Sequence, residues 1–299
     1  MIVITGGAGF IGWNLYQSLK DTHNVLLVDF EDSFKENNRE GCTVMDPLMF
    51  LAELGREDFA SKIDVILHNG ACSDTTMSDP FHMMTVNFDY SVTLLKYCIM
   101  HQIRLIYASS ASVYGDGPFE EHARSDPKNM YALSKSMFDE YAKCFQPFLP
   151  QLAGLRYFNV YGNYEDHKGN MSSVAYKFFN QSKSDEKTIK LFEGSDDFLR
   201  DFIHVDDIVA INKKFLENKD LGGIYNVGTG AERSFTDIAK IVSDRYGAEI
   251  EYIDMPEKLK GKYQKYTKSD NTKLSSMIEH DFLTLEDGVT KYLDFLESR

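Results

Sequence analysis

The chain has 299 residues, of which 43% are hydrophobic and 13% aromatic, and 32 basic residues against 46 acidic ones give a formal charge of −14. A chain of this length buries roughly 75% of the surface that it exposes when unfolded, so we expect one large α/β domain or two lobes that share a cleft. The content of 21 Phe and 17 Tyr excludes a disordered chain. The acidic balance argues against a nucleic-acid partner.

Cysteine spacing and hydropathy narrow the class further. Cys42, Cys72, Cys98 and Cys144 form no CxxC or Cys/His pair with metal spacing, so we expect no metal site and free thiols in a reducing cytoplasm. No apolar stretch approaches the ~20 residues that span a bilayer, so no membrane partner is expected. The N-terminus has the pattern of a strand and not that of a signal peptide.

Short apolar runs alternate with helical patterns through the first half of the chain. The pattern predicts buried strands at 2–5, 25–28, 64–67 and 104–107, and helices at 10–20 and 79–101. Such alternation is typical of a doubly wound parallel α/β sheet, which we place at 1–158 with a later segment at about 200–230 returning to it. From 159 the pattern loosens, with short strands predicted at 190–192 and 224–227. We therefore predict a smaller mixed α/β substrate-binding lobe over 159–299.

A glycine-rich turn follows the first predicted strand. Gly6, Gly9 and Gly12 have the spacing G-x-x-G-x-x-G between that strand and the first predicted helix. The first glycine permits a tight turn, the second lets the backbone approach a pyrophosphate, and the third lets the helix pack against the strand. The pyrophosphate would lie at a helix N-terminus, where free N–H groups and the macrodipole favour negative charge. The turn therefore predicts a dinucleotide-binding domain of the Rossmann type.

The second predicted strand ends in an acidic residue, Asp29. A carboxylate at this position accepts hydrogen bonds from the adenine ribose, which in general favours NAD. No arginine follows Asp29 directly, but Lys35 lies a few residues on and would meet the 2′-phosphate of NADP if it folds back. A solvated turn carboxylate is the alternative reading of Asp29.

A tyrosine and a lysine four residues apart mark the candidate catalytic centre. Tyr131 and Lys135 share one face of a predicted helix, so phenol and ammonium project into the same space. A nearby cation stabilises a phenolate, so we expect Lys135 to lower the pKa of Tyr131 towards the working pH. Ser110 lies in a Ser-rich loop after the strand at 104–107 and would hold the substrate hydroxyl, or the carbonyl that it becomes, because ligands of open α/β sheets bind at the carboxyl ends of strands.

Five motifs together resemble the extended short-chain dehydrogenase/reductase family, which contains sugar-nucleotide epimerases and dehydratases. They are TGGAGFIG at 5–12, ASSASVYG at 108–115, YALSK at 131–135, RDFIHVDD at 200–207 and YNVGTG at 225–230. The similarity spans the whole chain. Within the family, the segments 70–76, 156–162, 167–169, 191–195 and 258–264 resemble the epimerases that invert C6 of an ADP-linked heptose for the lipopolysaccharide core.

The resemblance implies an NADP-dependent homo-oligomeric isomerase that acts on ADP-heptose through a transient 6-ketone, with NAD still possible as the cofactor. It implies Tyr131 and Lys168 as two proton-transfer groups, with Lys135 at the nicotinamide ribose. Cofactor contacts would come from Phe10, Ile11, Asp29, Phe30, Lys35, His68, Asn69, Gly70, Ala71, Cys72, Asn87, Val160 and Lys168. Substrate contacts would come from Asn159, Asn170, Lys177, Phe192, Glu193, Gly194, Ser195, Arg200 and Tyr263.

Some positions depart from the family pattern. Phe30 stands where a polar residue usually contacts the cofactor, which keeps NAD open. Asn170 and Lys177 replace a Ser and a His that touch substrate in other members, which puts the tolerance for other sugar nucleotides in doubt.

Three other functions compete with this reading. A 4,6-dehydratase needs an Asp-Glu pair beside the serine, where this chain has Ala111 and Ser112. A non-catalytic dinucleotide sensor would lose the Tyr-Lys pair, which this chain retains. An epimerase that acts at C4 of a hexose remains the closest alternative.

The net negative charge conflicts with two anionic ligands unless the cleft is locally basic. Five lysines fall within eleven residues, and with Arg200 they would reverse the field at the cleft: Lys258, Lys260, Lys262, Lys265 and Lys268. A solvated basic face is the alternative for this run.

Overall fold

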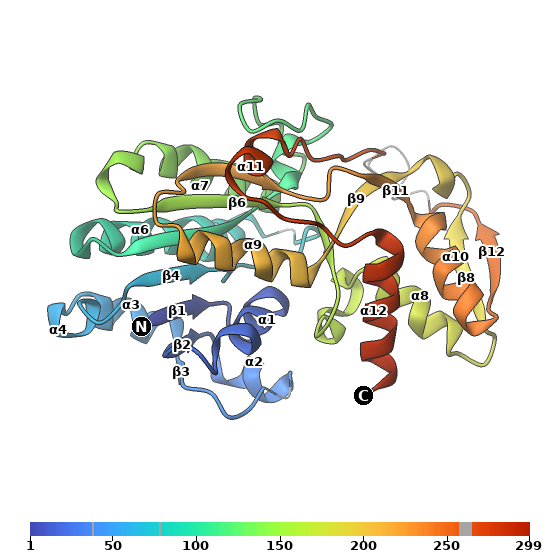
Figure 1. The fold of residues 1–299 in the computed structure, drawn as a ribbon, viewed down its shortest axis with the longest axis horizontal. Coiled ribbons are helices and arrows are strands. Elements are labelled where there is room, and N and C mark those ends of the chain that lie inside the picture. Colours follow the sequence, from blue (N-terminus) through green and yellow to red (C-terminus); the bar gives the residue numbers. More distant parts are fainter. Residues whose placement is uncertain (38, 78, 257–264) are drawn as a thin grey trace.

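The structure is a computed structural model, and it describes residues 1–37, 39–77, 79–256 and 265–299. A large sheet flanked by helices forms one lobe, and a smaller lobe with short strands lies beside it (Figure 1). Across the described residues, no group of three or more His, Cys, Asp or Glu side chains is placed to hold a metal ion, and no helix is long and apolar enough to cross a membrane.

The large lobe is built on seven parallel strands in the order β10-β6-β5-β4-β1-β2-β3. Because both faces are covered, the strands are nearly continuous apolar runs, and β1, β2, β4 and β6 are buried along their whole length. The strands are β1 Ile2–Thr5, β2 Val25–Val28, β3 Val44–Met45, β4 Val65–His68, β5 Arg104–Ser110, β6 Leu152–Tyr157 and β10 Gly223–Val227. The predicted doubly wound Rossmann-type fold is confirmed.

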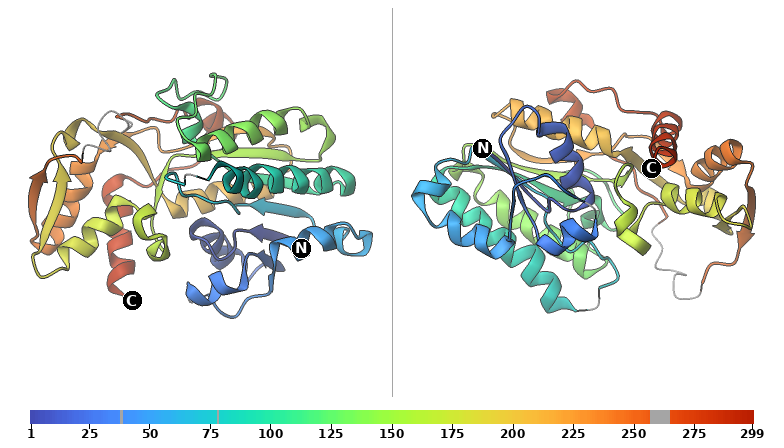
Figure 2. Two further views of the ribbon diagram at one scale, coloured as in Figure 1. Left: turned by 180° about the vertical axis from the view of Figure 1, so that it is seen from behind. Right: turned by 90° about the horizontal axis from the view of Figure 1, so that it is seen from below.

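Helices cover both faces of this sheet. α9 (Val205–Glu217) lies in front of the sheet in Figure 1, and α6 (Tyr90–His101) lies in front of it in the opposite view on the left of Figure 2. Ile2 and Ile4 of β1 face one core with α1, α9 and α11, whereas Val3 faces a second core with α3, α6 and α7. The helices of this lobe are α1 Phe10–Leu19, α2 Glu31–Glu36, α3 Pro47–Leu54, α4 Glu57–Ala60, α5 Pro80–Met84, α6 Tyr90–His101, α7 Met130–Lys143, α9 Val205–Glu217 and α11 Thr272–Met277.

The helix predicted over 79–101 is interrupted in the structure. Asp79 caps α5 by accepting hydrogen bonds from the N–H groups of Phe81 and His82. A π-helical turn, Thr85–Asp89, then separates α5 from α6. Such turns are frequent at functional sites, and this one carries Asn87. The apolar periodicity does not reveal the interruption because it continues on both sides.

The smaller lobe combines two short sheets with three helices around a separate apolar core. One sheet holds β7 Asn159–Tyr161, β9 Leu199–His204 and β11 Glu232–Ser234, and the other holds β8 Thr188–Phe192 and β12 Glu249–Ile253. The helices are α8 Val174–Ser182, α10 Phe235–Tyr246 and α12 Leu285–Glu297. Short 3₁₀ turns occur in both lobes at Ala111–Tyr114, Gln146–Phe148, Asp166–Met171 and Ser195–Asp197.

Candidate active site

The glycine turn between β1 and α1 forms a tight cradle. Gly6 adopts a φ of +69°, and a Cβ on Gly12 would lie 2.1 Å from the carbonyl oxygen of Gly6. α1 begins directly after Gly9, and among the described residues no side chain caps this end. The N–H groups of the first turn therefore remain available to an anion, and the cradle fits the pyrophosphate of a dinucleotide.

Asp29 lies at the end of β2 and is tied to the glycine turn. Its Oδ2 accepts the N–H of Ala8 at 3.0 Å, and its Oδ1 accepts the N–H of Phe30 at 2.9 Å. Burial raises the pKa of Asp29, and these two hydrogen bonds oppose the rise. Asn37 adds a contact that the sequence did not indicate, because its side-chain amide donates to the carbonyl of Ala8 at 3.1 Å.

The two candidate cofactor residues that follow Asp29 are both exposed. The side chain of Lys35 is 66% exposed, and its Nζ lies 2.8 Å from Glu31 Oε1 on the same helix. Phe30 is 58% exposed. Neither residue is fixed by the fold in the position of a cofactor contact.

The segment after β4 passes beside the glycine turn. A Cβ on Gly6 would lie 2.7 Å from the backbone nitrogen of Gly70, and that N–H donates to Thr5 Oγ1 at 3.1 Å. The ring of His68 points into the core, where its Nδ1 lies 2.6 Å from Thr5 Oγ1 and its Nε2 lies 2.8 Å from Ser91 Oγ. Burial lowers the pKa of His68 to about 3, so this histidine is a neutral anchor for the segment.

Asn87 in the π-helical turn holds the same segment in place. Its Oδ1 accepts the N–H of Cys72 at 2.8 Å, and its Nδ2 donates to the carbonyl of Cys72 at 3.0 Å and to Ser134 Oγ at 3.1 Å. Ser134 precedes Lys135 on α7. Asn87 thus links the segment 68–72, which includes Asn69 and Ala71, to α7.

Tyr131, Lys135 and Ser110 converge at the carboxyl end of β5. α7 begins at Met130, because Asn129 accepts the N–H of Ala132 at 2.8 Å and caps the helix. The Nζ of the buried Lys135 donates to the carbonyl of Ala108 at 2.8 Å, and burial lowers the pKa of Lys135 to about 8.

The electrostatics of Tyr131 differ from the sequence-based expectation. Burial raises the pKa of Tyr131, and a hydrogen bond with Ser110 opposes this rise without cancelling it. The pKa of Tyr131 is therefore raised overall, whereas we expected Lys135 to lower it towards the working pH. The pair shares a helix face, but the lysine is directed to the β5 backbone.

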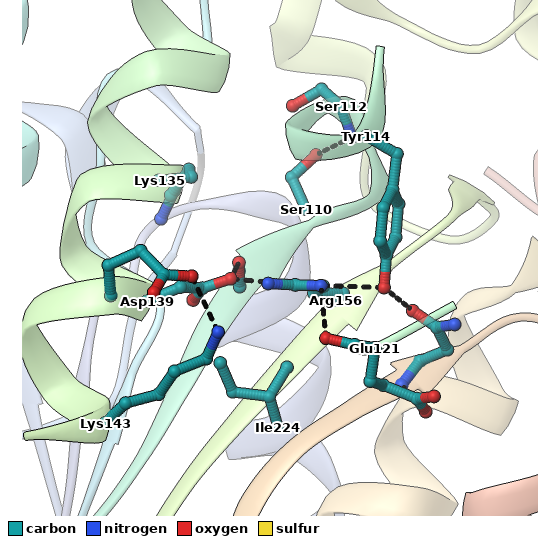
Figure 3. Close-up of polar contacts among 12 residues, drawn as sticks. Ser110, Ser112, Tyr114, Glu121, Lys135, Asp139, Lys143, Arg156 and Ile224 are labelled. Atoms are coloured by element: carbon teal, nitrogen blue, oxygen red, sulfur yellow. Dashed lines mark hydrogen bonds and ion pairs between the residues drawn. The ribbon is translucent and has the colours of Figure 1, made fainter. Parts of the chain in front are cut away.

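Figure 3 shows a buried polar network beneath this cluster. The sequence did not lead us to predict it. Asp139, on the same face of α7 as Lys135, accepts Arg156 Nε at 2.8 Å and Ser109 Oγ at 2.9 Å. Both members of the ion pair are fully buried. Arg156 also donates to the hydroxyl of Tyr114 at 2.8 Å. The network ties α7 to β5 and β6, and the helical spacing of Lys135 and Asp139 was the only signal for it.

Lys168 reaches the glycine turn from the smaller lobe. Its Nζ lies 5.1 Å from the ring centroid of Phe10, the first residue of α1. Burial lowers the pKa of Lys168, Lys177 acts in the same direction, and Glu165 opposes them. Of the other cofactor candidates, Ile11 lies in the first turn of α1 and Val160 lies in β7.

Apart from Ser110 on β5, those predicted substrate residues that the structure describes lie at four places in the smaller lobe. Asn159 opens β7, and its Oδ1 accepts Thr267 Oγ1 at 3.3 Å. Asn170 follows Lys168, and its carbonyl accepts Lys177 Nζ at 2.9 Å. Arg200 is buried in β9. The fourth place is the end of β8 and the turn after it, with Phe192, Glu193, Gly194 and Ser195.

The predicted basic cleft is only partly described. Tyr263, Lys258, Lys260 and Lys262 lie outside the described residues. Of the remaining two lysines of the run, Lys265 is exposed and Lys268 forms an ion pair with Glu232 at 2.8 Å.

Asp201 is a second buried carboxylate that accepts several hydrogen bonds and that we did not predict from the sequence. This fully buried residue of β9 accepts hydrogen bonds from the backbone N–H groups of Thr229, Gly230 and Ser269. It therefore fixes the turn after β10 against the strand that carries Arg200. The RDFIHVDD and YNVGTG motifs meet at this point.

Comparison with known proteins agrees with this geometry. Residues 2–228 match the NAD dependent epimerase/dehydratase family. Over 99% of its length the chain is 45% identical to an ADP-L-glycero-D-manno-heptose-6-epimerase of Brachyspira hyodysenteriae, 98% of which is covered.

Solved structures of epimerases share the fold over nearly the whole chain. The Helicobacter pylori ADP-L-glycero-D-manno-heptose-6-epimerase matches with a TM-score of 0.85 and 30% identity, covering 100% of this chain and 96% of that one. A UDP-N-acetylglucosamine 4-epimerase from Methanobrevibacter ruminantium matches with a TM-score of 0.86 and 26% identity, covering 99% and 98%. These relatives confirm the resemblance inferred from the motifs. The chain belongs to the NAD dependent epimerase/dehydratase family.

Proposed function

We propose that this protein inverts C6 of the heptose in ADP-D-glycero-D-manno-heptose to give ADP-L-glycero-D-manno-heptose. The proposal is supported by two candidate proton-transfer groups on different lobes, Tyr131 beside Ser110 at the carboxyl end of β5 and Lys168 beside the glycine turn. Tyr131 comes from α7 in the large lobe, and Lys168 comes from the smaller lobe and lies over Phe10. A full-length relative at 45% identity bears the name of this activity.

A nicotinamide dinucleotide bound at the glycine turn supplies the hydride acceptor for this chemistry. Gly6, Gly9 and Gly12 would hold its pyrophosphate, and Asp29 would accept hydrogen bonds from its adenine ribose. Lys135, whose Nζ lies at the carboxyl end of β5, would move from the Ala108 carbonyl to the nicotinamide ribose.

The proposed roles of the side chains follow from the chemistry of an unactivated alcohol. Ser110 would hold the C6 hydroxyl, and either Tyr131 or Lys168 would take its proton as a hydride passes from C6 to the bound dinucleotide. Once the resulting ketone had turned in the site, return of the hydride to the opposite face of C6 would invert this carbon. The second of the two groups delivers a proton to the oxygen, so no net oxidation occurs.

Two proton-transfer groups would be needed if the bound dinucleotide can exchange a hydride from one side of the sugar only. After the ketone turns, its oxygen points elsewhere, and the group that took the first proton is no longer in reach. Tyr131 and Lys168 lie on elements of different lobes, which suits this requirement. The lowered pKa of Lys168 makes its neutral, proton-accepting form more accessible.

Elimination of water is disfavoured by the residues beside Ser110. Ala111 and Ser112 follow it in the 3₁₀ turn Ala111–Tyr114, and neither supplies a carboxyl group. The N–H of Ser112 donates to Ser110 Oγ at 3.1 Å and fixes the serine itself. The site therefore holds the groups for oxidation and reduction, not the acid and base for dehydration.

The test is to incubate the native enzyme with ADP-D-glycero-D-manno-heptose and to follow C6 by NMR. We expect inversion at C6, and we expect Tyr131→Phe and Lys168→Met each to lower kcat at least 100-fold. Lys183→Met is a matched control, because this lysine lies at the end of α8 and pairs with Glu297. Inversion of a UDP-hexose at C4 with none at C6 would assign the C4 epimerase reaction instead.

We propose NADP as the cofactor, with Lys35 as the partner of the 2′-phosphate. The Lys35–Glu31 ion pair is exposed and contributes little, so a phosphate competes for the lysine. Asp29 works in the opposite direction, which makes NAD the alternative. Lys35→Gln should weaken NADP binding at least fivefold and leave NAD binding unchanged, as measured by calorimetry. An unchanged ratio of the two dissociation constants would exclude Lys35.

We further propose self-association through an aromatic surface at the C-terminal end of α7. Aromatic rings form a ladder there, from Phe88 in the π-helical turn through Tyr141 on α7 and Phe145 to Phe148 in the following 3₁₀ turn. The centroid distances are 6.1 Å for Phe88–Tyr141, 4.9 Å for Tyr141–Phe145 and 6.2 Å for Phe145–Phe148. Phe148 is 58% exposed. Phe148→Glu should lower the mass measured by light scattering, whereas an unchanged mass would move the interface elsewhere.

A further inference from the structure

The segment that carries Lys168 is closed by one buried carboxylate. Glu165 is fully buried. Its Oε1 accepts the N–H of Gly162 at 3.2 Å and the hydroxyl of Ser173 at 2.6 Å, and its Oε2 accepts the N–H of Ser173 at 2.6 Å. Gly162 follows β7 and Ser173 is the N-cap of α8. Glu165 therefore joins the two ends of the segment 162–173.

The backbone between these ends does not hold its shape by itself. Gly162, Tyr164 and Gly169 all have positive φ values, of 137°, 69° and 51°. For a non-glycine residue such as Tyr164, this conformation costs roughly 1 kcal/mol or more and persists only when surrounding contacts impose it. The hydrogen bonds of Glu165 supply such contacts, and the N–H of Lys168 donates to the Glu165 carbonyl at 3.0 Å.

The same carboxylate is the negative charge that acts on Lys168. Several groups with charge or titration face this lysine or its loop. Those on the segment itself are Glu165, Asp166 and His167, and those on other elements are Lys177 on α8, Tyr292 on α12, Arg39 and Arg299. The first turn of α1, which lies across from the ammonium, has no acidic residue. Glu165 raises the pKa of Lys168, whereas burial and Lys177 lower it.

We propose that Glu165 is a positioning residue for Lys168, which holds the segment 162–173 in the shape that brings the ammonium to the start of α1 and supplies its counter-charge. The inference rests on the proposed role of Lys168 in proton transfer. Glu165 lies inside the segment and its carboxylate is occupied by backbone and serine donors, so it acts through Lys168 and not on the substrate.

A double-mutant cycle tests this role. Glu165→Gln keeps the size of the side chain but places an amide N–H₂ where two N–H donors and a hydroxyl converge. We expect it to lower kcat about 30-fold in the wild-type background and less than twofold in the Lys168→Met background, with the Kd for the dinucleotide unchanged. Asp166→Asn is the matched control, because this neighbouring carboxylate pairs with Arg299 at 3.2 Å.

The pH profile gives a readout that a purely structural role would not move. Without the Glu165 charge the pKa of Lys168 falls further, so the limb of the kcat profile that Lys168 contributes should shift to lower pH in Glu165→Gln. The same limb should stay in place in Asp166→Asn. If Glu165→Gln fails to fold, Ser173→Ala removes one donor and should give a several-fold loss that again requires Lys168.

The outcomes separate this inference from the proposed function. Equal losses of kcat from Glu165→Gln in both backgrounds, or an unshifted pH limb, would overturn the positioning role, provided that Lys168→Met alone still lowers kcat at least 100-fold. Near-wild-type turnover of Lys168→Met would instead overturn the assignment of Lys168 itself, and with it the role of Glu165.

Discussion

Replacing Asp139 with Asn should destabilise the protein because it leaves Arg156 as an unpaired buried charge. Both side chains of this ion pair are 0% exposed, and the N–O distance is 2.8 Å. Removing one partner of a buried pair costs about 3–5 kcal/mol, because the remaining charge keeps its desolvation penalty without its counter-charge. For a chain of 299 residues, a loss of about 3 kcal/mol lowers Tm by roughly 5 °C.

The assay is urea and thermal unfolding followed by circular dichroism, with Glu140→Gln as the matched control. Glu140 is the next residue on α7, and its pair with Lys143 at 2.6 Å is exposed, so its loss should change little. The double variant Asp139→Leu with Arg156→Met should recover most of the lost stability, because two apolar side chains carry no desolvation penalty. A loss for Asp139→Asn no larger than that of Glu140→Gln would refute the reasoning.

Three further predictions concern buried groups and the glycine turn. Lys135→Met should lower turnover but raise the free energy of unfolding at pH 7 by roughly 1–3 kcal/mol. The reason is that burial disfavours the charged lysine and lowers its pKa from 10.5 to about 8. This gain in stability should shrink as the pH rises from 8 to 10.5. Between pH 6.5 and pH 3, the unfolded wild type binds a proton at His68 that the folded protein does not bind. The free energy of unfolding of the wild type should therefore fall with decreasing pH by up to about 1.4 kcal/mol per pH unit more than that of His68→Gln, as measured by denaturant unfolding. Gly12→Ala should weaken dinucleotide binding at least tenfold by calorimetry, because its Cβ would meet Gly6 O at 2.1 Å.

The parts of the fold that sequence predicts well are those in which a local pattern and the tertiary structure agree. β1 and β2 match the predicted strands at 2–5 and 25–28, because a buried parallel strand is apolar on both faces. The interruption of the helix at 79–101 escaped prediction, since a π-helical turn depends on hydrogen bonds of Asn87 to a distant loop, not on periodicity.

The candidate site shows the same division. Gly6, Gly12, Tyr131 and Lys135 follow from spacing, because their roles depend on local geometry. The networks of Asp139 with Arg156 and of Asp201 with the turn after β10 join different elements of the fold. The helical spacing of Lys135 and Asp139 indicates a shared helix face but does not reveal these partners. The direction of the Tyr131 pKa depends on burial against several elements, so a pairwise argument from Lys135 gave the wrong sign.

The position of β10 at the edge of the large sheet has a consequence for how the chain assembles. β10 pairs with β6, although β7, α8, β8 and β9 of the smaller lobe lie between them in sequence. A fragment that stops at Phe158 would therefore expose the β6 edge and the apolar surface on which α9 packs. Neither lobe is a continuous stretch of polypeptide. Most of the chain must therefore leave the ribosome before the sheet is complete, and no single cleavage of the chain yields two fragments that each contain a whole lobe.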